Sequence, residues 1–174
     1  SIFHIERPLA YDHNGARVVD GTETHQGTEM GLHWVHQQWL LASQAQWLDA
    51  RISGTTLGDN LNDTKPLNVP QLTLRALAQY RWSEVPGLRT ILRLNHEGQR
   101  RVLEDGTLNL PAWTTLDFAA HYDTRMQGTR TEWTVGIDNL MDQHYWRESP
   151  KQFGHYYLYP GAPRTARISL RTSF

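Results

Sequence analysis

The chain lacks cysteine, and it lacks any long run of apolar residues. Without cysteine there is no disulfide framework, no thiol nucleophile and no cysteine-ligated metal. No stretch approaches the roughly 18 consecutive apolar residues that a membrane-spanning helix requires. The mean hydropathy of -0.61 does not by itself make the chain soluble, because a membrane-spanning strand alternates apolar with polar residues.

An excess of one charge and the common catalytic motifs are also missing. The 17 Lys and Arg balance 18 Asp and Glu, which leaves no electrostatic footprint for nucleic acid. There is no His-Glu-x-x-His, no Gly-x-Ser-x-Gly and no glycine-rich phosphate loop, so we expect no enzyme. Among the nine histidines, His33 and His36 would lie on opposite faces of a strand. We therefore expect no protein metal site and no resident cofactor.

What is present is an alternation of apolar and polar residues with period two, which is typical of a strand with two different faces. In 165–174, Ala166, Ile168 and Leu170 alternate with Arg167 and Arg171. Other segments alternate in the same way or less regularly: 1–8, 24–37, 41–52, 71–82, 88–97, 115–122 and 132–138. The pattern predicts an all-β chain of about eight antiparallel strands, each near the 9–11 residues that cross a membrane. Leu77 and Ile91 interrupt it, since both fall on polar faces.

The predicted links between these strands alternate in length. Short links lie near 39–41, 83–86 and 123–130, and longer links rich in Gly, Pro, Asn and Asp cover 9–23, 53–69, 98–112 and 140–162. Such alternation is typical of an antiparallel transmembrane β-barrel, with short periplasmic turns and long extracellular loops. Four aromatic residues fall at the inferred periplasmic strand ends on the lipid face, where an interfacial girdle is expected: Trp82, Tyr122, Trp133 and Phe174.

Several motifs resemble one family in an ordered series. The stretch THQGTEMGLHW is followed by DARISGTT and KPLNVP, and later by LPAWTTLDFAAHYDT, WTVGIDNLMDQHYW and YPGAPRTARISLRTSF. An Asn-Leu-hydrophobic-Asp turn begins at Asn139, an aromatic pair follows at Tyr145 and Trp146, and a Gly-x-Pro-Arg entry leads into the last strand. Together these resemble the C-terminal barrel of TonB-dependent outer-membrane siderophore receptors.

That resemblance implies a larger protein. Barrels of this family have about 22 strands and a plugged lumen, so residues 1–174 would be the closing part, with the N-terminal plug domain absent. The opening at Ser1, without Met or signal peptide, is interpreted as that of a mature or cut fragment. The resemblance implies uptake of a ferric siderophore across the bacterial outer membrane, in contact with the lipid bilayer. Energy would come from TonB through the missing N-terminal part. Phe174 would be the signal for the outer-membrane assembly machinery, or simply a membrane-boundary ring.

The long loops hold the candidate ligand-binding residues, because aromatic faces and cations suit a metal chelate. These candidates are Tyr145, Trp146, Arg147, Tyr156, Tyr157, Arg100 and Arg101. Each ring has the alternative of packing its loop onto itself or onto the barrel. Charged residues predicted to line the lumen as ion pairs are Arg75, Arg93, Arg167 and Arg171 beside Glu97, Asp117, Glu132 and Asp138.

Two other interpretations remain open from the sequence. One is a stand-alone eight-stranded outer-membrane barrel, and the other is a soluble antiparallel β binding domain that buries its apolar residues. The sequence does not identify the siderophore, or distinguish it from another nutrient such as haem or cobalamin.

Overall fold

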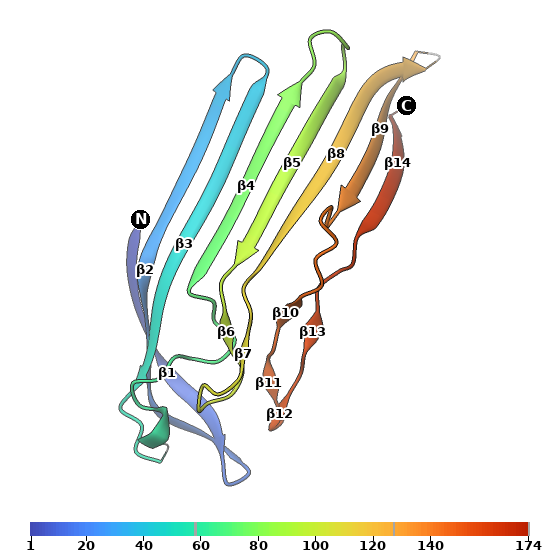
Figure 1. Cartoon of the computed structure of the whole chain (residues 1–174). Helices are drawn as coiled ribbons and strands as arrows, with labels where there is room; N and C mark the ends of the chain where they lie inside the picture. Colours follow the sequence, from blue (N-terminus) through green and yellow to red (C-terminus); the bar gives the residue numbers. More distant parts are fainter. Residues whose placement is uncertain (58, 127, 174) are drawn as a thin grey trace.

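The computed structural model describes residues 1–57, 59–126 and 128–173 and consists of one large antiparallel sheet (Figure 1). The sheet has eight strands in the order β1-β2-β3-β4-β5-β8-β9-β14. Phe174, the predicted assembly signal, lies outside the described residues. The eight strands are β1 Ile2–His13, β2 Ala16–His36, β3 Trp39–Ser53, β4 Leu72–Arg81, β5 Leu88–Glu97, β8 Trp113–Met126, β9 Thr129–Asp138 and β14 Thr165–Ser173.

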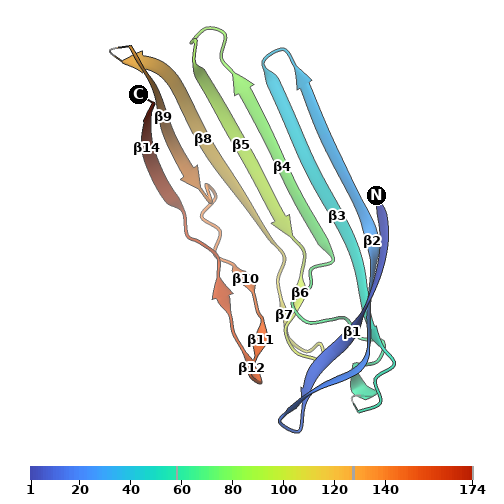
Figure 2. The same ribbon diagram turned by 180° about the vertical axis from the view of Figure 1, so that it is seen from behind.

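The sheet is open. Its first and last strands, β1 and β14, lie at opposite margins in both views of the molecule (Figures 1 and 2), and within the described residues neither pairs with the other. Each therefore leaves one edge of backbone donors and acceptors unpaired, as expected for strands that continue into a wider sheet. A closed eight-stranded barrel, one of the alternatives from the sequence, does not match this arrangement.

The links alternate between the two ends of the sheet. β2–β3, β4–β5 and β8–β9 are joined at one end, here called the short-turn end, and the remaining links gather at the other, the loop end (Figure 1). Within the described ranges, the loop end carries three short two-stranded ladders and one 3₁₀ turn. These elements are η1 Asp59–Leu61, β6 Arg100–Arg101, β7 Asn109–Leu110, β10 Trp146–Glu148, β11 Lys151–Gln152, β12 His155–Tyr156 and β13 Tyr159–Pro160. Among the described residues, no helix has the length and apolarity to span a membrane.

One predicted loop is wrong. Residues 9–23 do not form a long link, because β1 and β2 stay paired as far as His13 and Ala16. The chain reverses within Asn14-Gly15, whose φ angles are 51° and 78°. Positive φ at both central residues is the requirement of a type I′ hairpin turn, and Asn-Gly meets it at little cost. The first hairpin consequently projects beyond the rest of the sheet at the loop end (Figure 1).

The register separates the two faces, since directly paired residues project to the same side of a sheet. One face, called the apolar face, collects large apolar side chains, and Met30, Val135 and Ile168 on it are 72%, 53% and 72% exposed. A soluble monomer rarely exposes so extensive an apolar surface, so the soluble β domain is wrong. Other exposed members of this face are Ile2, Leu32, Trp34, Trp39, Trp47, Leu72, Leu92, Phe118, Tyr122, Trp133 and Leu170.

Aromatic rings gather near the short-turn end of the apolar face. Trp82, Tyr122 and Trp133 lie there, as the sequence predicted. Tyr80 packs against Trp39 at 4.7 Å between ring centroids and against Trp82 at 5.1 Å. The Trp82 indole N–H donates to the Thr90 hydroxyl at 3.2 Å. Trp82 thus keeps an apolar surface outward while its polar group is satisfied within the sheet.

The opposite face, called the polar face, holds the predicted lumen residues. Arg93 lies directly opposite Asp117, and the Arg167 Nε lies 3.2 Å from an Asp138 carboxylate oxygen. The two exceptions to the alternation, Leu77 and Ile91, also project from this face. There Leu77 pairs with Ala42 and Ile91 pairs with Ala119, while Leu40 lies next to Ala42 on the same face of β3, so these residues form one apolar patch on the polar face.

Candidate functional site

The loop end encloses a cleft between segments far apart in the sequence. It measures about 380 Å³, within the range of small-molecule sites, and we call it the rim cleft. The first hairpin, the loops after β3 and β5, and the segment between β9 and β14 all contribute side chains. The lining residues are Arg7, Leu9, Ala10, Tyr11, Asp12, Arg17, Glu23, Ile52, Leu61, Leu67, Asn68, Glu104, Pro150 and Lys151.

The floor of the rim cleft is apolar and includes one of the few places where the molecule buries a core. Leu9, Ile52 and Leu61 pack together, each about 6% exposed, and Tyr11 packs against them. Burying such side chains contributes roughly 1.5–3 kcal/mol each, so this cluster ties the first hairpin to the 54–71 loop. The floor is therefore a surface of packed side chains rather than a gap between loops.

Asp20 fixes the loop that follows β3. Its carboxylate accepts hydrogen bonds from the backbone N–H groups of Thr56 and Leu57 at 2.9–3.1 Å, and from the Tyr11 hydroxyl at 2.8 Å. The Leu57 amide, followed by the Tyr11 hydroxyl, lowers the pKa of Asp20 from 3.8 to about 2, because these donors stabilise the charged carboxylate. Asp20 is consequently ionised at any physiological pH and holds the loop against β2.

The walls of the rim cleft carry charges of both signs in pairs. Arg7 pairs with Glu23, whose carboxylate also lies 3.2 Å from the His25 Nε2. Lys151 donates to the Glu104 carboxylate at 2.6 Å. Burial alone would lower the pKa of Lys151, but the hydrogen bond and charge of Glu104 outweigh it and raise that pKa above its usual value. The cleft therefore offers cations and carboxylates side by side over an apolar floor.

Asn68 joins the three loops behind the cleft. Its side-chain oxygen accepts from the Ser149 N–H at 2.9 Å, and its backbone oxygen accepts from Arg100 at 2.7 Å. Its own N–H donates to the Arg101 carbonyl at 2.9 Å. Asn68 has φ of 59°, a conformation that Asn adopts more readily than most residues. One side chain thus connects links that are 81 residues apart in sequence.

The segment 145–161 forms an irregular hairpin, called the arm, that hangs from the sheet at the loop end (Figure 2). Its base is fixed by Asn139, 4% exposed, whose amide nitrogen donates to the Gln143 and Ala162 carbonyls at 2.9 and 3.1 Å. Tyr145 packs on Trp113 with ring centroids 4.5 Å apart. The Asn-Leu-hydrophobic-Asp turn is therefore a structural device that closes the base of the arm.

The seven predicted ligand-binding residues have different surroundings. Arg100 pairs with Glu97, Arg101 donates to the Leu103 carbonyl at 3.1 Å, and Tyr145 is packed on Trp113. Four others are on the arm. There Trp146, Tyr156 and Tyr157 expose their rings, and Arg147 pairs with Glu148 at 2.7 Å. None of the seven is among the described residues that line the rim cleft. Their role in binding stays a prediction.

Sequence reasoning missed the residues that do line the cleft, among them Arg7, Tyr11, Arg17 and Lys151. A signal for the first hairpin was present, because Asn14-Gly15 flanked by strand-like residues predicts a two-residue turn. That turn alone would place Arg7 opposite Thr22, and a register shift between Pro8 and Ala10 brings it opposite Glu23. No comparable signal marks Lys151, whose position depends on loops that meet only in the folded sheet.

A second pocket opens on the polar face beneath the arm. Among the residues that line it are Arg75, Asp117, Trp113 and Tyr145. The Trp113 indole N–H is buried and has no hydrogen-bond partner within the described part of the chain. The described residues include no group of three or more His, Asp or Glu side chains placed to hold a metal ion.

Comparisons with known proteins agree with this geometry. The family model of the TonB-dependent receptor-like β-barrel matches residues 9–140. The metal-pseudopaline receptor CntO of Pseudomonas aeruginosa is 28% identical over 142 residues, which are 79% of this chain and 19% of that protein. The chain thus spans about a fifth of the length of this curated relative.

Solved structures superpose on almost the whole chain. BauA, the ferric preacinetobactin receptor of Acinetobacter baumannii, is 25% identical with a TM-score of 0.82, over 97% of this chain and 26% of BauA. The siderophore receptor PiuA of the same species has a TM-score of 0.80 at 18% identity, over 97% of this chain and 25% of PiuA, and supports the fold alone. With a family model that covers most of the sequence, the chain belongs to the β-barrel family of TonB-dependent receptors.

Proposed function

We propose that the chain is the closing part of the barrel of an outer-membrane receptor that imports a chelated metal ion, most simply a ferric siderophore. The observation that carries the proposal is the division of the sheet into an exposed apolar face and a charged polar face. In a closed barrel the first would meet lipid and the second would line the lumen. A wall of this kind supplies shape and charge to a transport path and needs no catalytic residue.

The loop end would then face the outside and the short turns the periplasm, as in other bacterial barrels. In this orientation the rim cleft opens toward the medium, where a ligand first arrives. Its paired cations and carboxylates above an apolar floor suit a compact polar chelate, because such a ligand can exchange one ion pair for another without leaving a buried charge unpaired. Transport would be energised by TonB acting on the part of the protein that precedes this chain, and Phe174 would serve barrel assembly.

The test uses the full-length protein, expressed in a bacterium without its own siderophore receptors. Two radiolabelled probes follow from the similar proteins: ferric preacinetobactin and metal–pseudopaline. We expect the protein to require detergent for extraction and to support uptake of at least one probe, with uptake lost when TonB is deleted. Extraction without detergent, or no uptake of any probe, would show the proposal to be wrong.

A further inference from the structure

Two arginines in the wall of the rim cleft keep part of their guanidinium groups free. Arg7 directs its Nε and Nη2 atoms to the Glu23 carboxylate, and Arg17 directs its Nη1 atom to an Asp12 oxygen at 3.3 Å. Within the described part of the chain, no other polar group is bonded to the remaining N–H groups of these arginines. A guanidinium group carries five N–H donors, so each arginine can bind a second acceptor without giving up the first.

The cations of these two pairs are more exposed than their carboxylate partners. The Arg7 side chain is 59% exposed and that of Glu23 is 11%, while Arg17 and Asp12 are 66% and 39% exposed. Glu23 is also engaged by the His25 Nε2 at 3.2 Å. A ligand that enters the rim cleft therefore meets the two guanidinium groups before the carboxylates that lie behind them.

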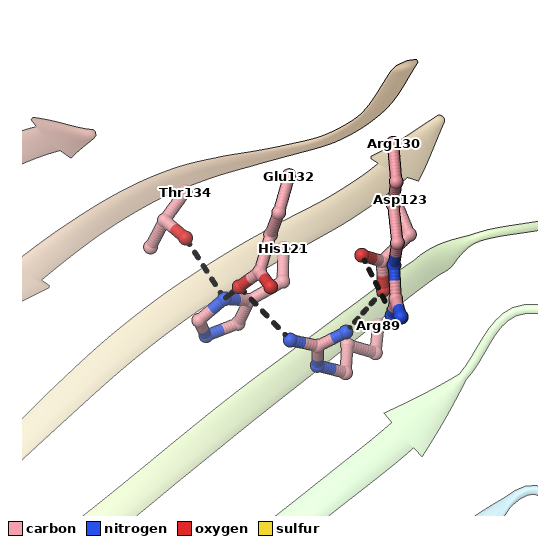
Figure 3. Close-up of polar contacts among 6 residues, drawn as sticks. All are labelled: Arg89, His121, Asp123, Arg130, Glu132 and Thr134. Carbon is pink, nitrogen blue, oxygen red and sulfur yellow. Dashed lines mark hydrogen bonds and ion pairs between the residues drawn. The ribbon is translucent and has the colours of Figure 1, made fainter. Parts of the chain in front are cut away.

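Arg89, at the short-turn end of the polar face, is an arginine whose guanidinium group is fully engaged. Its Nη1 lies 2.6 Å from the Asp123 carboxylate and its Nη2 lies 3.1 Å from the Glu132 carboxylate (Figure 3). Its side chain is 26% exposed. Because carboxylates occupy both ends of the group, Arg89 has no edge left for a further anion. The two cleft arginines differ from it both in exposure and in their free donors.

The surface between the two cleft arginines is mainly aliphatic. Arg17 lies opposite Asp12, five positions along β1 from Arg7, so the two arginines are roughly 16 Å apart along the hairpin. Two long side chains shorten that span from both ends. Tyr11 supplies the one aromatic ring among the described lining residues, and its hydroxyl already donates to Asp20. The floor can thus pack a hydrocarbon skeleton, but it offers little aromatic surface for stacking.

The ionisable lining residues balance in charge. Three cations stand against three carboxylates: Arg7, Arg17 and Lys151 against Asp12, Glu23 and Glu104. A chelate with three negative charges and three rings, such as a ferric tris-catecholate, would meet these carboxylates without a stacking surface in return. A neutral trihydroxamate chelate would leave the free guanidinium edges without an anion.

We propose that the rim cleft selects chelates that carry free carboxylate groups, which bind the exposed edges of Arg7 and Arg17. This substrate class rests on the proposed function, because the cleft must open toward the medium. Arginine and carboxylate match through two parallel N–H···O bonds, a geometry that an ammonium group does not reproduce. The aliphatic floor takes the hydrocarbon part of the same ligand.

Equilibrium dialysis of the full-length protein in detergent, with radioactive iron, measures the preference. Ferric citrate and ferric rhizoferrin are the carboxylate probes, ferrioxamine B is the trihydroxamate and ferric enterobactin is the tris-catecholate. We expect at least one carboxylate probe to bind about tenfold or more tightly than both of the others. Tighter binding of ferrioxamine B or ferric enterobactin, or no binding of either carboxylate probe, would overturn the proposal.

Arg7→Lys with Arg17→Lys tests the two residues while the net charge and both ion pairs are kept. Each lysine has a single ammonium group, which the original carboxylate partner already engages, so the affinity for the carboxylate probe should fall about tenfold. The matched control is Arg51→Lys with Arg164→Lys, whose side chains are each 54% exposed and paired at 3.4 Å outside the cleft. The control should leave that affinity unchanged.

The outcomes separate this proposal from the proposed function. Heat-modifiable migration in gels would show that the barrels of both variants are folded. Equal affinity in the two folded variants would show that the cleft arginines do not bind the ligand. Cellular uptake of a chelate without carboxylates would contradict the substrate class alone, whereas extraction of the protein without detergent would contradict the proposed transport.

Discussion

Gly161 is the position at which the smallest substitution should disturb the arm most. A β-carbon placed there would lie 2.1 Å from the Tyr145 Cζ and 2.2 Å from its Cε1. Distances this short cannot be accommodated without movement, and the ring is held on its other side by Trp113 at 4.5 Å. Gly161→Ala should therefore expel Tyr145 from its place at the base of the arm.

The cost can be estimated from what is lost. An aromatic pair contributes about 0.5–1.5 kcal/mol beyond the area it buries, and overpacking a filled site costs about 1–3 kcal/mol. The sum is about 1.5–4.5 kcal/mol. This cost falls on the arm, because the hydrogen bond from the Gly161 N–H to the Tyr145 carbonyl, 2.8 Å long, closes the arm at the same point. Each 1.4 kcal/mol changes the opening equilibrium about tenfold.

Hydrogen exchange on the full-length protein measures this directly. In Gly161→Ala the peptides that cover 145–161 should lose protection by roughly tenfold or more, while those of β4 and β5 keep theirs. Gly31→Ala is the matched control, because its β-carbon would have the Ser43 carbonyl, at 3.9 Å, as its nearest neighbour. Unchanged exchange in the arm of Gly161→Ala would refute the packing argument.

Three further outcomes follow from the same structure. Because the pKa of Asp20 is lowered from 3.8 to about 2, its stabilisation of the 54–57 loop should be complete above pH 4 and be lost as the pH falls toward 2. Protection of the Leu57 amide from hydrogen exchange measures this stabilisation, and Asp20→Asn should abolish its pH dependence. Lys151→Met should leave Glu104 unpaired in the rim cleft and weaken uptake, whereas Lys151→Met with Glu104→Gln should recover part of it in the same transport assay. Asn14→Val should strain the left-handed turn of the first hairpin by about 1–2 kcal/mol and lower the amide protection of the β1–β2 tip from hydrogen exchange. The comparison variant is Gly54→Ala, which is also at positive φ but lies outside any hairpin.

Much of the sheet could be predicted from its period of two. The predicted ranges 71–82, 88–97 and 165–174 correspond to β4, β5 and β14 within one or two residues. Each of these strands contributes one side to the apolar face and the other to the polar face, so apolar and polar residues alternate in the sequence. The segment 41–52 alternated poorly because Ala42 and Ile52 of β3 are apolar residues on the polar face, Ala42 in its apolar patch and Ile52 in the floor of the rim cleft. The extended first hairpin was missed because the turn signal in Asn14-Gly15 was outweighed by the polar residues around it.

The site was harder to predict than the sheet. Aromatic and basic residues in loops are common, and nothing in their spacing distinguishes Tyr145, which packs at the base of the arm, from Tyr157, which is exposed. The rim cleft depends on Asn68 and on the Lys151–Glu104 contact, which join loops through tertiary structure. The pairing of Arg81 with Arg89, by contrast, depends on register, so it could be seen only once the strands were paired.

The central claim is that the apolar face lies in lipid while the polar face lines the lumen. Because the chain has no cysteine, single cysteines can be introduced at adjacent positions on opposite faces. Spin labels at Val135→Cys and Ile168→Cys, in the full-length protein in membranes, should collide with oxygen dissolved in lipid. Labels at Thr134→Cys and Ser169→Cys should be shielded from it. Equal oxygen accessibility at all four positions, or the reverse pattern, would contradict the assignment of the faces and the transport proposal with it.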